Sequence, residues 1–242
     1  MDVHLAVVLA LAAAAGPIPS PSPDGQDVVA DTDRMSAREY DERTRMSRTF
    51  PNELWRLYGA DAAAKGDFGD AVRHFRHAAR YGDKYSQHRI SLMYWHGAGV
   101  EVDRALAYAW ADLAAERMYP SFVVLREKMW MTMQPAERER ALRAGQALYD
   151  EFGDETAKPR LARAIENSTR DITGSRTGFY DERLQVVGTS RGRGIGGDLG
   201  NFDLTPMYAD WRRDPHRYWA AEDAVWSHGN VEVGEVRRAD ER

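Results

Sequence analysis

The sequence predicts an all-α protein: an α/α superhelical solenoid of helix hairpins, followed by a glycine-rich, irregular tail with a short helix and short strand candidates. Three observations predict this fold. Apolar residues recur at helical spacing from residue 52 to about 167. Glycine or proline separates these periodic stretches, as expected of short turns. A pattern of alanines repeats after about 36 residues, a period typical of stacked helix pairs.

Composition narrows the class of protein. Of 242 residues, 43% are hydrophobic and 29% are charged, which suits a thin architecture with much surface per residue. The net charge of −5 provides no general attraction for nucleic acid, which we therefore do not expect as a partner. The chain has no cysteine, so disulfides, thiolate zinc sites, cysteine nucleophiles and a lipoprotein anchor are excluded.

The first fifty residues are expected to form a signal peptide and a linker. Residues 5–15 are an unbroken apolar run that is too short to span a bilayer and has Ala13, Ala14 and Ala15 directly before Gly16, although residues 1–4 lack Lys and Arg. We therefore expect residues 1–15 to be removed, leaving a periplasmic or secreted protein without a stable membrane anchor. Residues 16–50 are rich in proline and serine, then in charge, and are expected to be mostly disordered, with some unpacked helix around 36–45.

Residues 51–168 are expected to form the solenoid. Asn52 is the expected N-cap of the first helix, and Gly66 its end. Pro135 suits the first position of a later helix, because its missing N–H has no partner there. The other expected helices begin near residues 70, 85, 103, 120 and 155.

Two of these helices share a pattern of small residues. Ala71 precedes the pair at 78–79, and Ala107 precedes the pair at 114–115 with the same spacing. Alanine pairs let two helices approach closely, while a bulky residue on each stripe, Phe75 or Trp110, fills the space toward the next hairpin. The pattern therefore predicts repeated hairpins.

Residues 169–242 form the tail, and glycine is frequent between residues 174 and 200. Residues 184–187 and 231–233 are strand candidates, and residues 215–227 are expected to form a helix. That helix would carry Tyr218, Ala221 and Val225 on one stripe, with Trp219 and Trp226 beside it. We expect the three tail tryptophans, Trp211, Trp219 and Trp226, to pack against the open end of the solenoid.

Residues 92–103 read LMYWHGAGVEVD and are followed by AYAW at 107–110 and LAA at 113–115. This segment resembles the Sel-one-like repeats of exported bacterial proteins, relatives of the tetratricopeptide solenoids. The resemblance is specific for residues 85–116 and fair for 52–84, where the G-x-G-V turn is missing and His74 takes the tryptophan position. It implies a right-handed superhelix, an adaptor role, and packing roles for Tyr94, Gly97, Gly99, Ala107, Trp110, Ala114 and Ala115.

Two patterns suggest cofactor or metal sites, and neither is favoured. Residues 192–197 match G-x-G-x-x-G, but the residues that follow begin a helix poorly, and no β-α-β unit surrounds them. His74 and His77 share a helix face, but nearby arginines would repel a cation. We therefore expect no cofactor, no metal ion and no catalytic residues.

The function that the sequence favours is a non-enzymatic scaffold or adaptor that binds another protein in the bacterial cell envelope. The alternative is a module that binds peptidoglycan or another carbohydrate through the tail tryptophans. A hydrolase ranks last, because no nucleophile context accompanies the serines. The expected partner surface consists of Arg73, Arg76, His77, Arg80, Trp95 and His96.

Overall fold

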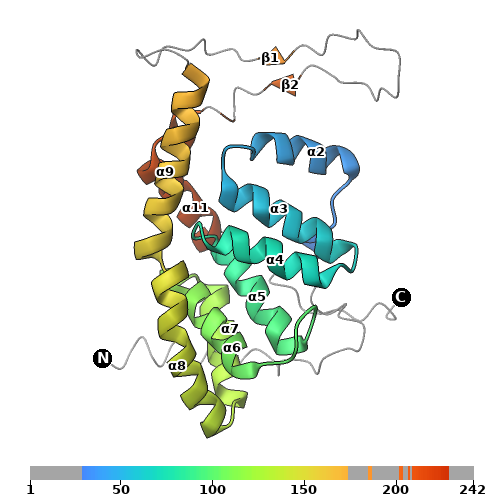
Figure 1. The fold of residues 1–242 in the computed structure, drawn as a ribbon, viewed down its shortest axis with the longest axis vertical. Helices are drawn as coiled ribbons and strands as arrows, with labels where there is room; N and C mark the ends of the chain where they lie inside the picture. Colours follow the sequence, from blue (N-terminus) through green and yellow to red (C-terminus); the bar gives the residue numbers. More distant parts are fainter. Residues whose placement is uncertain (1–28, 174–184, 187–201, 204–206, 208, 229–242) are drawn as a thin grey trace.

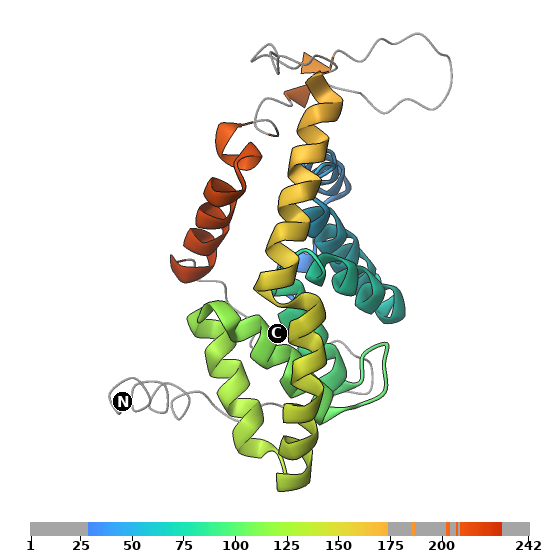
Figure 2. The same cartoon turned by 60° about the vertical axis from the view of Figure 1, so that its left-hand side comes forward.

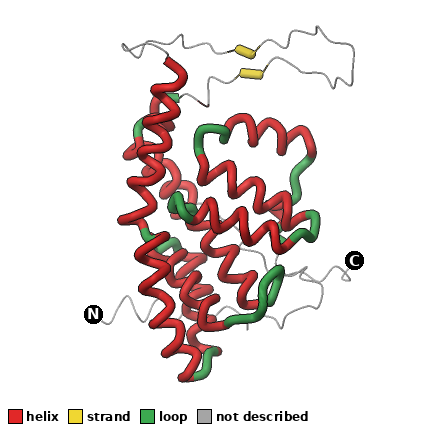
Figure 3. Tube along the Cα trace, in the orientation of Figure 1, coloured by secondary structure: helices red, strands yellow, loops and turns green. Residues whose placement is uncertain are grey.

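The computed structural model describes residues 29–173, 185–186, 202–203, 207 and 209–228. Helices dominate this part of the chain, so the predicted all-α class is confirmed (Figure 3). The elements between residues 29 and 173 are η2 (Asp31–Asp33), α2 (Ala37–Met46), α3 (Pro51–Ala64), α4 (Phe68–Ala79), α5 (Lys84–His96), α6 (Arg104–Ala114), η3 (Ala115–Arg117), α7 (Pro120–Thr132), α8 (Pro135–Phe152) and α9 (Asp154–Thr173). The tail contributes α10 (Asp210–Arg213) and α11 (Pro215–His228).

Two very short strands complete the described elements. Strand β1 (Gln185–Val186) pairs antiparallel with β2 (Phe202–Asp203). Strand β1 lies inside the range 184–187, whereas the other strand candidate, residues 231–233, lies outside the described residues. The expected signal peptide at 1–15 and the glycine motif at 192–197 also lie outside them and stay predictions.

Helices α3 to α6 pack in chain order, and together with α8 they share one core. Figure 1 shows α2, α3 and α4 one below another, with α5 beneath them and α9 upright along one side. A single cluster of buried apolar side chains extends from α3 to α8. Within it, the Trp110 ring lies 4.8 Å from the Phe152 ring, centroid to centroid. The core therefore joins successive helices along the chain.

Small residues set the contact distances in this core. Ala71, Ala78 and Ala79 of α4 are fully buried, and so are Ala107, Ala114 and Ala115. A Cβ on Gly59 of α3 would lie 2.6 Å from the ring of Phe75, so only glycine leaves room for that ring. Close packing of α3 on α4 therefore depends on a missing side chain.

The start of α3 differs from the expected one. The helix begins at Pro51, and Asn52 lies within its first turn, fully buried, rather than at the N-cap. Its Nδ2 donates a hydrogen bond of 2.6 Å to the hydroxyl of Tyr218 in α11. Asn52 therefore joins two distant parts of the chain instead of capping a helix.

The segment before α3 is more ordered than expected for its described part, residues 29–50. Helix α2 is capped by Ser36, and the flanking side chains Asp33, Ser47 and Phe50 are buried. A carboxylate oxygen of Asp33 lies 2.6 Å from a guanidinium nitrogen of Arg89 in α5, and both side chains are 1% exposed. The expectation of an unpacked linker is wrong here, because charge density does not reveal which charges have a buried partner.

The turn between α5 and α6 also contacts the preceding hairpin. Gly97 and Gly99 have φ of 76° and 72°, in the left-handed region that favours glycine. A Cβ on Gly99 would lie 2.3 Å from the carbonyl carbon of Phe68, where α4 begins. The G-x-G turn therefore packs backbone against backbone.

Replacing Gly99→Ala should lower the free energy of unfolding by about 2–4 kcal/mol, from left-handed strain plus overlap with Phe68. Gly145→Ala is the matched control, because Gly145 lies in α8 with no atom within 4 Å of its would-be Cβ. The control should gain about 0.5–1 kcal/mol. Urea denaturation followed by circular dichroism at 222 nm measures both, and equal stability of the two variants would contradict the packing described.

Candidate functional site

The cationic face predicted on α4 exists, although its arginines have neighbours. Arg73, Arg76, His77 and Arg80 are all exposed. Arg73 pairs with Asp70 one turn away, and Arg80 lies 3.8 Å from Glu151. Such exposed pairs contribute little to stability, so these side chains can rearrange around a partner at low cost.

An aromatic cluster that the sequence analysis missed lies beside these arginines. The half-buried ring of Trp55 in α3 stacks on His77 at 4.6 Å and on His74 at 5.4 Å. Tyr58 meets Trp55 edge to face at 5.5 Å. Burial lowers the pKa of His74, so its ring is neutral near pH 7. The two aromatic residues of α3 are three positions apart, at 55 and 58, and so are the two histidines of α4, at 74 and 77. This shared spacing was the sequence signal that could have predicted the cluster.

Trp95 and His96 do not belong to this surface. Trp95 is 6% exposed and His96 is 8% exposed, so the expectation that they are accessible is wrong. Trp95 packs in a second apolar cluster with Ala105 and Met129, and the guanidinium of Arg104 lies 5.2 Å above its ring. The last turn of α5 faces inward because α5 lies between neighbours on several sides.

Helix α5 is the most deeply buried helix among those described, although it is rich in polar residues. Ser86, Gln87, His88 and Arg89 are each at most 1% exposed. Burial and the charge of Arg89 lower the pKa of His88 to about 3, and its ring stacks on Phe122 at 4.7 Å. His88 is therefore a neutral core residue.

The tail returns to the start of the helical array. Tyr218 of α11 is fully buried, and its ring stacks on Phe50 at 5.4 Å. Its hydroxyl accepts the bond from Asn52 and donates one of 2.9 Å to a carboxylate oxygen of Glu53. Sequence spacing could not indicate a pairing across about 165 residues.

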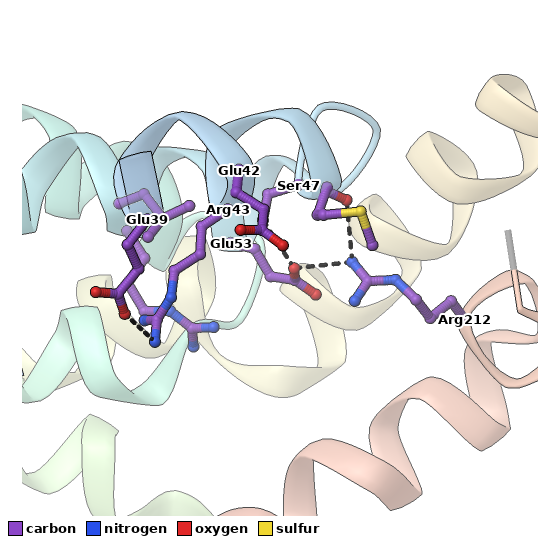
Figure 4. Close-up of a pocket in the computed structure, with 9 residues that line it drawn as sticks. Glu39, Glu42, Arg43, Ser47, Glu53 and Arg212 are labelled. Carbon is purple, nitrogen blue, oxygen red and sulfur yellow. Dashed lines mark hydrogen bonds and ion pairs between the residues drawn. The ribbon is translucent and has the colours of Figure 1, made fainter. Parts of the chain in front are cut away.

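A cavity of about 470 Å³ opens next to this junction, between α2, α3 and α10 (Figure 4). The other carboxylate oxygen of Glu53 accepts hydrogen bonds from Ser47 at 3.0 Å and from Arg212 at 2.8 Å. The lining contains both carboxylates and guanidinium groups and consists of Glu39, Glu42, Arg43, Met46, Ser47, Glu53, Arg56, Leu57 and Arg212.

The arginines of this cavity already have carboxylate partners. Arg43 lies 2.9 Å from Glu39, and Arg56 lies 2.8 Å from Asp83. A charged ligand would have to displace one of these pairs. We therefore interpret the cavity as a gap between docked segments.

Trp219 and Trp226 of the tail pack against the helical array, whereas Trp211 is 42% exposed. Trp219 is 8% exposed, with the guanidinium of Arg117 4.4 Å from its ring centroid and the ammonium of Lys158 at 5.4 Å. Trp226 stacks on Tyr85 at 5.4 Å. The chain itself therefore contacts the rings of Trp219 and Trp226.

A compact ionic cluster lies beside Trp219. The ammonium of Lys84, 1% exposed, lies 2.5 Å from Glu116 and 3.2 Å from Asp154. Burial alone would raise the pKa of Asp154, but hydrogen bonds from Arg117 and the charge of Lys84 hold it well below its ordinary value. The opposite charges are paired, which suits a structural role better than acid–base chemistry.

Over residues 29–173 and the described parts of the tail, no three His, Asp or Glu side chains come close enough to hold a metal ion. Within the same residues, no helix is both long and apolar enough to cross a bilayer.

The buried His88 predicts a pH dependence of stability. Unfolding returns its pKa from about 3 to 6.5, so the unfolded chain binds a proton that the folded chain excludes. The contribution of neutral His88 to the free energy of unfolding is fully present above pH 6.5. As the pH falls from 6.5 to 4.5, the free energy of unfolding should decrease by about 2 kcal/mol. His88→Phe should flatten this slope in denaturation series, whereas replacing the exposed His216→Phe should not. An unchanged slope in His88→Phe would contradict the assignment.

Comparisons with models of protein families, with curated proteins and with solved structures gave no match to this chain. The resemblance of residues 85–116 to Sel-one-like repeats therefore rests on their motif residues alone and stays a prediction.

Proposed function

We propose that this chain is a non-enzymatic scaffold of the bacterial cell envelope whose helix hairpins form an α-solenoid and bind another protein. The order of packing supports the solenoid. Helix α3 packs on α4, α4 on α5, α5 on α6, and α6 on α7 and α8. The alanines at equivalent places in α4 and α6 are fully buried, as in stacked repeats.

The single observation that carries the binding role is the exposed face of α3 and α4. It combines the Trp55–His77 stack with the guanidinium groups of Arg73, Arg76 and Arg80. Tryptophan and arginine are the residue types that dominate binding energy at protein interfaces. A cationic, aromatic face on a chain of net charge −5 indicates a partner with an acidic surface.

The envelope location rests on the apolar run at residues 5–15 and its alanine-rich end. Determining the N-terminal residue of the protein purified from its own host tests this part separately. A chain that keeps Met1 would contradict export, while leaving the binding face to be tested in the cytoplasm.

Charge reversal of Arg73, Arg76 and Arg80 to glutamate should release the partner. Cross-linking in envelope extract, followed by mass spectrometry, should recover one acidic protein with the wild type and not with this variant. The matched control reverses three exposed arginines elsewhere, Arg38, Arg143 and Arg163, and changes the net charge equally. The control should retain the partner.

Trp55→Ala should weaken binding of that purified partner at least about 30-fold, because an interface anchor is worth about 2 kcal/mol or more.

Two results would overturn the proposal. The first is equal loss of the partner in the control variant, which would indicate a nonspecific charge effect. The second is binding of purified muropeptides that disappears when Trp219 and Trp226 are replaced by alanine, which would favour the carbohydrate-binding alternative.

A further inference from the structure

Helix α11 lies across the edge of the array where three other helices begin. Its side chains contact Asn52 in the first turn of α3, Tyr85 in the first turn of α5, and Phe122 in the first turn of α7. Figure 2 shows α11 beside the upright α9. We name this edge, formed by the first turns of α3, α5 and α7 together with α9, the docking edge.

One stripe of α11 makes these contacts. Tyr218 and Trp219 are followed four residues later by Glu222 and Asp223, and then by Trp226. Residues at these spacings share a helix face. Val225, which was expected on one stripe with Tyr218 and Ala221, is 58% exposed, whereas Tyr218 is fully buried. The stripe that faces the array combines three aromatic rings with two carboxylates.

The docking edge complements this stripe in charge. Arg56 lies 3.8 Å from Glu222, and Arg117 lies 3.6 Å from Asp223. The N-terminal ends of α3, α5 and α7 add the positive ends of three helix dipoles at the same edge. An acidic, aromatic helix therefore fits this edge in both shape and charge.

The array does not depend on α11 for its main core. The two apolar clusters that join α3 to α8 contain no residue of α11. Helix α11 contributes to a smaller cluster with Phe50, Leu161 and Ile165, and Asp223 remains 42% exposed. Burial and the charges of Glu53 and Asp83 raise the pKa of Glu222, and the charge of Arg56 compensates for them only in part. Helix α11 therefore packs on the array outside its two main apolar clusters and is connected to α9 through residues 174–209.

We propose that the docking edge is a binding surface for an amphipathic helix of another protein, and that α11 is its internal occupant. The partner helix carries two adjacent aromatic residues, two acidic residues four positions later, and a further aromatic residue at the position of Trp226. It displaces α11 when it binds. This surface is separate from the α4 face, so each proposal can fail without the other.

A fluorescent peptide of residues 209–228 serves as the probe, with the full-length chain and fluorescence anisotropy as the measurement. The wild type should bind the peptide weakly, because its own α11 competes from the same chain. The full-length variant Tyr218→Ala/Trp226→Ala should bind at least tenfold more tightly, whereas the control Val225→Ala should match the wild type. A peptide with both acidic residues changed to lysine should lose at least tenfold in affinity for the double variant.

Hydrogen exchange of the wild type keeps the proposal testable if the double variant fails to fold. Excess peptide should speed exchange in residues 210–228 and leave α4 to α6 protected. Unchanged exchange in α11, or equal binding of the acidic and lysine peptides, would overturn the proposal. Wild-type dimers that the peptide dissociates would show instead that the occupant is α11 of a second copy. Charge reversal at Arg73, Arg76 and Arg80 should leave peptide binding unchanged.

Discussion

The close approach of neighbouring helices is the constraint on which this structure depends. Alanines at the contacts of α4 and α6, and the bare backbone of Gly59, bring helix axes near enough for Phe75 and Trp110 to be enclosed. No helix of this length can bury its apolar stripe alone, so each one needs its neighbour. The exposed face of α4 and the position of every turn follow from that stacking.

Much of the array could be predicted because its signals are local. These signals are the helix periodicity, the turn glycines and the aspartate at residue 103, and each acts over a few residues. The side chain of Asp103 caps α6 by accepting a hydrogen bond from the backbone N–H of Leu106. The alanine spacing identified residues that the structure places in helix contacts. Local signals also located α11, although they did not identify which of its faces is buried.

The contacts between distant segments could not be predicted, because they depend on pairings that leave no periodic trace. Asp33 with Arg89, and Tyr218 with Glu53, join residues whose individual sequence context is that of ordinary surface positions. Trp95 was expected on the accessible partner surface, yet it is 6% exposed. Helix α5 has polar residues on almost every side, so no stripe indicated that it lies at the centre.

The ion pair between Asp33 and Arg89 sets a boundary for shortening the chain. A fragment that starts where the predicted solenoid starts, at residue 51, would keep every helix from α3 onward and yet remove the carboxylate that faces a guanidinium buried in α5. Breaking a buried pair from one side costs about 3–5 kcal/mol, a large share of the stability of an ordinary domain. A fragment that keeps the full stability of the fold therefore begins before Asp33, inside the stretch that composition alone would have discarded.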